Sequence, residues 1–257
     1  LTAFQGGAPL GVAVSGGSDS LALLHLVAAI APHLGAQVRA VTVDHRLRPG
    51  STDEAAEVAR ISSALGVAHD TLIWDHGAIA GNLMDRARRA RYALIADWAQ
   101  AKGVAKVAVA HTADDQAEAF VMGLARRAGL DGLSGMRPEW QQGVTFLRPL
   151  LAVSRADLRA YLVRRGVAWI DDPSNDNPRF TRARARQALQ ALAPLGITTK
   201  GLADVVQHLA AAQGALQQAT VAASALVSHT AGALQMDPAG FAALPPEIGR
   251  RLLAVCL

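Results

Sequence analysis

The chain has 257 residues, of which 51% are hydrophobic and 18% are charged, so it is long enough to bury a sizeable core. Lys and Arg number 25 and Asp and Glu number 21, and the resulting formal charge of +4 excludes a histone-like polyelectrolyte. Its one cysteine, Cys256, excludes a disulfide framework and a cysteine zinc cluster within this sequence. We therefore expect a reducing, cytoplasmic setting. No run reaches the roughly 18 apolar residues of a membrane helix, and no signal peptide is recognisable, so no membrane partner is expected.

The first informative stretch is an apolar run at 10–14 followed by a polar, glycine-containing turn and then by helical periodicity over 18–31. This order predicts a strand, a tight loop and the N-terminus of a helix, which together form an anion site because backbone N–H groups and the helix dipole converge there. An alternative is a simple glycine turn in which Ser18 caps the helix. The turn consists of Ser15, Gly16, Gly17, Ser18, Asp19 and Ser20.

Strands and helices then alternate at the spacing of βαβ units. The pattern predicts strands at 38–43, 68–74, 106–110 and 144–147, and helices at 52–65, 82–102 and 114–128. Such alternation indicates an α/β fold, with a mostly parallel twisted sheet that carries helices on both faces. Ligands in this class bind beyond the carboxyl ends of the strands, so we expect Ser15, Asp44 and His111 to share that edge.

The character of the sequence changes after Ser154. A helix is predicted to Arg165, followed by a turn-rich segment at 171–178, an arginine-dense run at 179–186 and an Ala- and Gln-rich helical region from Gly201. The pattern predicts a glycine-rich loop at 129–138 and no strand after 201 until Gln235 and Met236. Two domains are therefore predicted, at 1–196 and 197–257. Because the chain begins without Met and stops inside an apparent helix, we expect a longer polypeptide.

The loop at 15–20 contains neither the lysine nor the spacing of a Walker A loop, and no G-x-G-x-x-G follows a predicted strand. The run Ser-Gly-Gly-Ser-Asp-Ser resembles instead the pyrophosphate-binding loop of the N-type ATP pyrophosphatases, the PP-loop family. That resemblance implies ATP as the nucleotide, a substrate oxygen that becomes adenylated, and pyrophosphate as a product. It agrees with an anion site that holds pyrophosphate by backbone donors, hydroxyl groups and Mg²⁺.

Later segments resemble those of the tRNA(Ile)-lysidine synthetases, in the same order, and together with the loop they span about two-thirds of the chain. The segment Asp172-Pro173-Ser174-Asn175 before spaced arginines is the most discriminating, because sulfur-inserting relatives lack it. The chain departs from that family at Ala119, where Thr is usual, and at Phe180, Ala183 and Ala185, where Tyr, Asn and Ile are usual. The other matching segments are Val43–Arg48, Ala87–Tyr92, Ala110–Glu118 and Arg148–Leu151.

The resemblance implies an ATP-dependent ligase. In that family the C2 oxygen of the wobble cytidine of tRNA(Ile), in a CAU anticodon, attacks the α-phosphate of ATP, and the ε-amine of L-lysine then displaces AMP to give lysidine. A family member would have a PP-loop catalytic domain at 1–196 and a helical domain that binds the substrate tRNA at 197–257. The sequence does not specify the oligomeric state, and a homodimer is one of the states considered.

The resemblance also implies roles for individual residues. The implied catalytic residues are Asp44, His111, Asp114, Asp115 and Glu118. The implied ATP-binding residues are Ser15, Gly16, Gly17, Ser18, Asp19, Ser20 and Arg91, and Mg²⁺ would be held by Asp19 and Asp115. The residues implied to contact the substrate or tRNA are His45, Arg88, Asn175, Arg182, Arg184 and Arg186. From the residues alone, the acids could equally be helix-capping groups and the arginines a solvated basic face. Asp44 and His45 could form an ordinary turn at a strand end.

Two other functions are compatible with the loop. A tRNA thiolase or another adenylating PP-loop enzyme would share it, although the absence of cysteine pairs disfavours sulfur relay. A non-catalytic nucleotide-sensing or RNA-binding module would keep the fold without turnover. Loss of turnover with retained RNA affinity in carboxylate variants would distinguish an enzyme from such a module.

Overall fold

The computed structural model describes residues 9–47, 49–75, 77, 83–171, 181–230 and 233–256. The chain divides into two compact units. The first comprises Leu1–Glu118 and Met136–Ala203, and the second comprises Ala119–Gly135 and Asp204–Leu257. Each unit is described by itself below.

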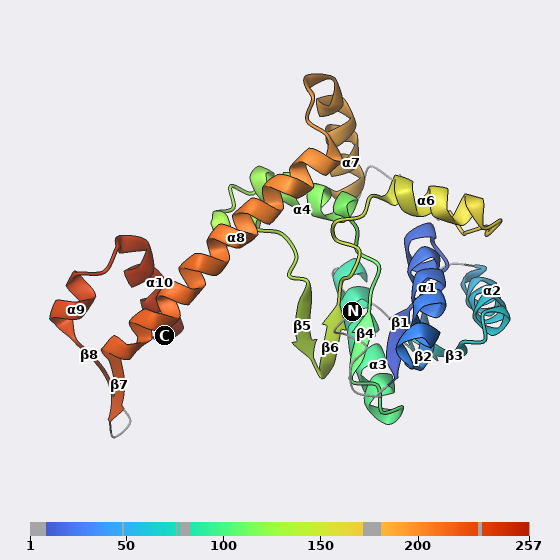
Figure 1. Cartoon of the computed structure of the whole chain (residues 1–257), viewed down its shortest axis with the longest axis horizontal. Helices are drawn as coiled ribbons and strands as arrows, with labels where there is room; N and C mark the ends of the chain where they lie inside the picture. Colours follow the sequence, from blue (N-terminus) through green and yellow to red (C-terminus); the bar gives the residue numbers. More distant parts are fainter. Residues whose placement is uncertain are drawn as a thin grey trace. The chain divides into compact units, whose positions relative to one another are not determined.

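A six-stranded sheet organises the first unit (Figure 1). The strand order is β3-β2-β1-β4-β6-β5, and every pairing is parallel except that of β5 with β6. The predicted α/β fold with a mostly parallel sheet is therefore confirmed. The strands are β1 (Leu10–Ala13), β2 (Val38–Asp44), β3 (Ala68–Ile73), β4 (Lys106–Ala108), β5 (Glu139–Gln142) and β6 (Val144–Leu147).

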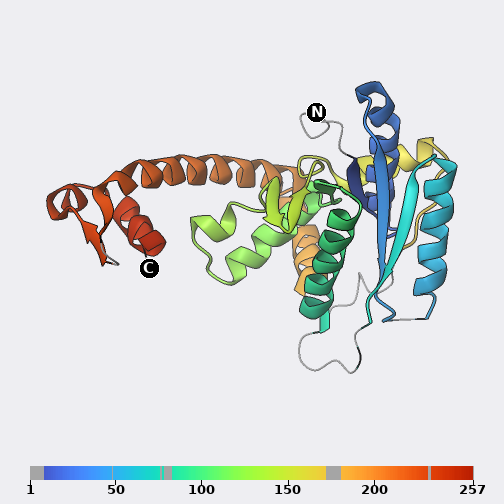
Figure 2. The ribbon, with the colours of Figure 1, turned by 90° about the horizontal axis from the view of Figure 1, so that it is seen from below.

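Helices cover the two faces of this sheet, and Figure 2 shows β2 and β3 between α2 and α3. One buried cluster packs side chains of α1, α2 and α6 against β1 and β2, whereas a second packs α3 against the other side of β2, β4 and β6. The helices of this unit are α1 (Ser18–Ile30), α2 (Ser51–Ala64), α3 (Leu83–Ala101), α6 (Arg155–Arg164) and α7 (Thr181–Leu192), with 3-10 turns at Ala31–Leu34 and Ala193–Leu195. Helices α4 (Ala113–Ala125) and α8 (Thr199–Ala223) begin here and continue into the second unit.

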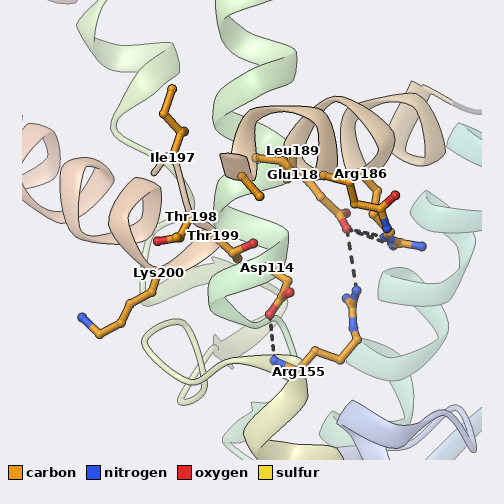
Figure 3. A pocket seen from close by; sticks show the side chains of 11 residues that line it. Asp114, Glu118, Arg155, Arg186, Leu189, Ile197, Thr198, Thr199 and Lys200 are labelled. Carbon is orange, nitrogen blue, oxygen red and sulfur yellow. Dashed lines mark hydrogen bonds and ion pairs between the residues drawn. The ribbon is translucent and has the colours of Figure 1, made fainter. Parts of the chain in front are cut away.

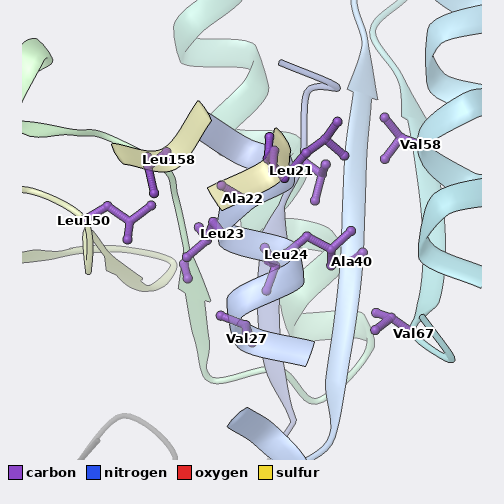
Figure 4. Close-up of a cluster of buried hydrophobic side chains, with 14 of the residues drawn as sticks. Leu21, Ala22, Leu23, Leu24, Val27, Ala40, Val58, Val67, Leu150 and Leu158 are labelled. Carbon is purple, nitrogen blue, oxygen red and sulfur yellow. The ribbon is translucent and has the colours of Figure 1, made fainter. Parts of the chain in front are cut away.

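The position of α1 depends on its apolar residues. Leu21 and Leu24 are almost fully buried and lie in the same cluster as Ala40 of β2 and Leu158 of α6 (Figure 4). Burying one such leucine contributes about 1.5–3 kcal/mol to folding. Packing on this face therefore fixes the N-terminus of α1 at the carboxyl end of β1.

Strand β2 is buried on both faces because helices pack against each face of the sheet. Ala40 packs in the first cluster and Val41 in the second, as the alternation of strand side chains requires. The hydroxyl of Thr42 donates to the carbonyl oxygen of Val14 at 2.9 Å, which ties the end of β1 to β2. The polar residues that follow these two strands are thereby brought to one edge.

The second unit is mainly helical but contains a small hairpin. Strands β7 (Val227–Thr230) and β8 (Ala233–Met236) pair antiparallel, and the sequence pattern indicated only the end of the second of them. Arg251 donates to both carboxylate oxygens of Asp131, at 2.8 and 2.9 Å. Short helices complete the unit: α5 (Leu130–Leu133), within the predicted glycine-rich loop, a 3-10 turn at Ser224–Leu226, α9 (Pro238–Ala242) and α10 (Pro246–Cys256). Among the residues that the structure describes, no helix has the length and apolar character that crossing a membrane requires.

The packing of α1 predicts the cost of truncating Leu24. Leu24→Ala should lower the free energy of unfolding by about 2–5 kcal/mol, because it removes a fully buried side chain and leaves a cavity. The exposed Leu34→Ala is the matched control and should change the stability by less than about 0.5 kcal/mol. Urea denaturation followed by circular dichroism measures both. Equal effects of the two substitutions would contradict this packing.

Candidate active site

The loop between β1 and α1 has the backbone of an anion site. Gly16 has a φ of +85°, and a Cβ atom on it would lie 2.8 Å from Cδ1 of Ile170, so a side chain does not fit there. Gly17 precedes the first helical residue, and no side chain caps the helix. The alternative in which Ser18 is the N-cap is therefore wrong. The first N–H groups of α1 are available to an anion, as a pyrophosphate site requires.

The hydroxyl of Ser20 stabilises this loop from inside. It accepts a hydrogen bond from the backbone N–H of Ser15 at 3.1 Å and donates to the carbonyl oxygen of Gly17 at 3.0 Å. Ser20 is buried, whereas Ser15 is exposed. The loop conformation is thus fixed before any ligand binds, which lowers the entropic cost of binding one.

At the end of β2, Asp44 is buried, and its two carboxylate oxygens accept hydrogen bonds from residues that follow it in the chain. One oxygen accepts from the backbone N–H of Arg46 and the other from the hydroxyl of Thr52, each at 2.9 Å. Burial raises the pKa of Asp44, but hydrogen bonds, that of Ser51 foremost, outweigh it and hold the pKa below its usual value. The neighbouring His45 meets the ring of Trp74 edge to face, with centroids 5.7 Å apart.

At the end of β4, Thr112 and Asp115 form a reciprocal cap of α4. The backbone N–H and the hydroxyl of Thr112 donate to Oδ2 of Asp115 at 2.9 and 3.1 Å, and the N–H of Asp115 points back to that hydroxyl at 3.4 Å. Oδ1 of Asp115 is left facing the site. Oδ2 of the adjacent Asp114 accepts from the backbone N–H of Arg155 at 2.7 Å.

Arg155, the first residue of α6, lies among the acids of two other elements. Its Nε donates to Oδ2 of Asp19 in the loop at 2.9 Å, while its terminal nitrogens lie 3.7 Å from Oδ1 of Asp115 and 3.7 Å from Oε1 of Glu118. Burial acts against its positive charge, but the carboxylates, that of Asp19 foremost, hold the pKa of Arg155 above its usual value. This residue joins the loop between β1 and α1 to α4.

Glu118 is the most buried of these acids, with 1% of its side chain exposed. Nε and Nη2 of Arg186 both lie 2.9 Å from its Oε1, and its buried Oε2 has no hydrogen-bond partner among the described residues. Glu118 lines a pocket of about 470 Å³ (Figure 3). The other residues that line it are Asp114, Arg155, Arg186, Leu189, Gln190, Ala193, Ile197, Thr198, Thr199 and Lys200.

The structure places the predicted arginines in three different surroundings. Arg182 lies 3.8 Å from Asp115, so it joins Arg186 at the acidic cluster. Arg184 is exposed and points to the hydroxyl of Thr181 at 3.4 Å. Arg88 and Arg91 of α3 lie over the ring of Tyr92, 5.9 and 5.1 Å from its centroid. The predicted Asn175 lies outside the described residues.

His111 is half-buried at the end of β4. Its Nδ1 accepts a hydrogen bond of 3.2 Å from Nε of Arg148. Burial lowers the pKa of His111 from 6.5 to about 4, and Arg148, Arg182 and Arg91 add to this effect while Asp115 opposes it. His111 is thus neutral near pH 7.

The carboxylates of Asp19 and Asp115 fit a site for Mg²⁺ in their chemistry. Both face the same positive group, the guanidinium of Arg155, and hard oxygen ligands are those that Mg²⁺ takes alongside substrate phosphates. Within the described part of the chain, no group of three or more His, Cys, Asp or Glu side chains is arranged to hold a metal ion.

Comparisons with known proteins bear on this geometry. The model of the PP-loop domain, an ATP-binding family, matches residues 3–193. A tRNA(Ile)-lysidine synthase of Ruegeria pomeroyi is 50% identical over 95% of this chain and 59% of its own length, and one of Bradyrhizobium sp. is 41% identical over 95% and 72%. The chain belongs to the PP-loop family of tRNA(Ile)-lysidine synthases. The family predicted from the motifs is therefore confirmed.

This family assignment agrees with two further matches. The lysidine synthase of Zymomonas mobilis is 40% identical over 95% of this chain and 73% of its own length, so the chain spans from 59% to 73% of these three relatives. The U34-tRNA thiolase NcsA of Methanococcus maripaludis superposes with a TM-score of 0.69 over 82% of this chain and 74% of its own, at 14% identity. At that identity the likeness shows a shared fold.

Sequence reasoning missed Arg155 and gave no role to Arg148. A signal for the former was present, because an arginine in the first turn of a helix is disfavoured by the helix dipole and suggests a compensating group of acids. For Arg148 the matching segment Arg148–Leu151 was noticed, but its hydrogen bond to His111 depends on a contact between two strand ends.

The low pKa of His111 predicts a pH dependence of stability. Between about pH 4 and pH 6.5 the unfolded chain binds a proton at this residue that the folded chain does not, so the free energy of unfolding falls as the pH is lowered through this window. The wild type should lose roughly 1–2 kcal/mol more than His111→Gln between about pH 7.5 and pH 5. Urea denaturation at both pH values measures this difference. An equal loss in the two proteins would contradict the lowered pKa.

Proposed function

We propose that the chain is the catalytic part of an ATP-dependent ligase that forms lysidine at the wobble cytidine of tRNA(Ile) with a CAU anticodon. One observation carries the proposal: the loop acid Asp19 and the α4 acids Asp115 and Glu118 converge on Arg155, so an anion-binding loop adjoins a buried acidic site. Family membership supports this reading, since the curated relatives are named tRNA(Ile)-lysidine synthase.

In the first step, the C2 oxygen of the cytidine attacks the α-phosphate of ATP, and the bond to the β-phosphate breaks to release pyrophosphate. The N–H groups at the start of α1 and the hydroxyls of Ser15 and Ser18 would stabilise the charge that develops on the leaving group. Mg²⁺ held by Asp19 and Asp115 would neutralise phosphate charge when bound. Asp44 and His45, at the end of β2, would contact the adenosine, and Arg91 a phosphate.

In the second step, the ε-amine of L-lysine attacks C2, and the bond from C2 to its oxygen breaks so that the oxygen leaves with AMP. The amine arrives as an ammonium and must lose one proton before its nitrogen can attack. The unpartnered Oε2 of Glu118 in the wall of the pocket is a suitable acceptor for such a cation, because a buried carboxylate oxygen without a hydrogen bond is costly. Asp114, which also lines the pocket, would help to hold it.

Binding of the tRNA would use the basic residues around this edge. Arg88, Arg182, Arg184 and Arg186 would supply salt-dependent phosphate contacts, and Asn175 and His45 are further candidates. We assign the catalytic domain to 1–196 and a share of tRNA binding to the helical region 197–257.

The test is product formation with purified components. ATP, L-lysine and the tRNA(Ile) transcript with a CAU anticodon should yield AMP, pyrophosphate and lysidine, and a transcript with uridine at the wobble position should yield none. Asp115→Asn should lower kcat/KM by about 100-fold or more, because it removes a carboxylate that binds Mg²⁺ and supports the cap of α4.

The matched control is Asp53→Asn, an exposed acid in the first turn of α2, which should keep near wild-type activity. The products are measured by chromatography of nucleotides and of digested tRNA. Lysine-independent AMP release with no modified cytidine would contradict the proposal, as would full activity of Asp115→Asn.

A further inference from the structure

The hydrogen bond between Arg148 and His111 fixes the chemical form of the imidazole. An arginine side chain carries N–H donors and has no acceptor, so Nδ1 of His111 must supply the lone pair in the 3.2 Å contact with Nε of Arg148. In a neutral imidazole with an unprotonated Nδ1, the proton is on Nε2. His111 therefore presents an N–H group through Nε2 and has no free lone pair in its ring.

Arg148 is itself held in place by two further contacts. Its Nη1 donates to the carbonyl oxygen of Arg137 at 2.6 Å, and its guanidinium lies 3.8 Å from the centre of the Trp140 ring. That ring stacks on Phe146, which is fully buried, with centroids 4.8 Å apart and planes 15° from parallel. The antiparallel strand β5, which supplies Trp140, thus supports the orientation of Arg148.

The charged groups around His111 also favour the neutral ring. Arg91 of α3, Arg182 of α7 and Arg148 oppose a positive charge on it, and Asp115 of α4 alone among the groups named favours one. Protonation of Nδ1 would in addition set its N–H against the N–H of Arg148. Both effects exclude the imidazolium form while Arg148 stays in place.

We propose that Arg148 is a positioning residue that holds His111 as a neutral Nε2–H donor, and that the proton of the attacking amine goes to a carboxylate of the site and not to His111. This inference rests on the proposed function and excludes His111 as the acceptor of that proton, because a histidine with no free lone pair in its ring cannot accept it. His111 then donates a hydrogen bond to an oxygen of a bound substrate. The carboxylates available to accept the proton of the amine are those of Asp114, Asp115 and Glu118.

Two substitutions of His111 distinguish a donor from a base. The amide nitrogen of Gln reaches the position of Nε2, whereas that of Asn reaches the position of Nδ1. If His111 is a donor, His111→Gln should keep kcat within about tenfold of the wild type and His111→Asn should lose about 100-fold, the usual effect of removing one such donor. If His111 is the base, both variants lose kcat to the same extent, and that result would overturn the inference.

The role of Arg148 is tested by nitrogen NMR of ¹⁵N-histidine-labelled protein, without ATP or tRNA. The wild type and the control Arg60→Lys, which alters an exposed pair with Glu57, should show an unprotonated Nδ1 and a protonated Nε2 for His111. Arg148→Met should show a mixture of the two tautomers. Arg148→Lys keeps a positive charge at this position, and this second variant checks that the effect of Arg148→Met does not come from misfolding. A protonated Nδ1 in the wild type, or an unchanged tautomer in both Arg148 variants, would overturn the inference.

These outcomes separate the two proposals. The tautomer is read without substrates, so its failure leaves the proposed ligase activity intact. Absence of lysidine from a wild-type protein with the expected tautomer would instead contradict the proposed function.

Discussion

The site depends on one guanidinium that several carboxylates share. Arg155 meets Asp19 from the loop after β1 and Asp115 and Glu118 from α4, and each of these acids would be costly to place at a partly desolvated edge without a positive neighbour. The same residue donates its backbone N–H to Asp114. The network therefore joins three elements that are far apart in the sequence. Its positive and negative charges offset one another, and binding of ATP and a metal would change that balance.

The parallel sheet explains why these elements meet. The carboxyl ends of β1, β2 and β4 lie at one edge, and the helices that follow β1 and β4 begin there, so backbone donors and first-turn acids face the same space. The loop provides an anion site, and the pocket beside Glu118 provides a buried acid for a cation. An anion and a cation thus have separate, oppositely charged places at one edge, which is the arrangement that the proposed adenylation and aminolysis require.

Much of this arrangement could be predicted from the sequence. The alternation of apolar segments was enough to predict a mostly parallel sheet, and the residues at the strand ends were correctly expected to share an edge. Arg155 was missed because its acidic partners lie from 37 residues away, as with Glu118, to 136 residues away, as with Asp19, and no local pattern reports such a contact. Strand β5 was missed because four residues, Glu139–Gln142, show no apolar alternation, although the strand supplies the ring that supports Arg148.

The central claim is that the oxygen at C2 of the cytidine becomes adenylated at this site. The most direct measurement uses the tRNA(Ile) transcript with ¹⁸O at C2 of the wobble cytidine and follows the label by mass spectrometry after lysidine has formed. The account predicts that the released AMP carries the label and that the modified tRNA has lost it. Unlabelled AMP, with the label retained in the tRNA or released to water, would contradict the account.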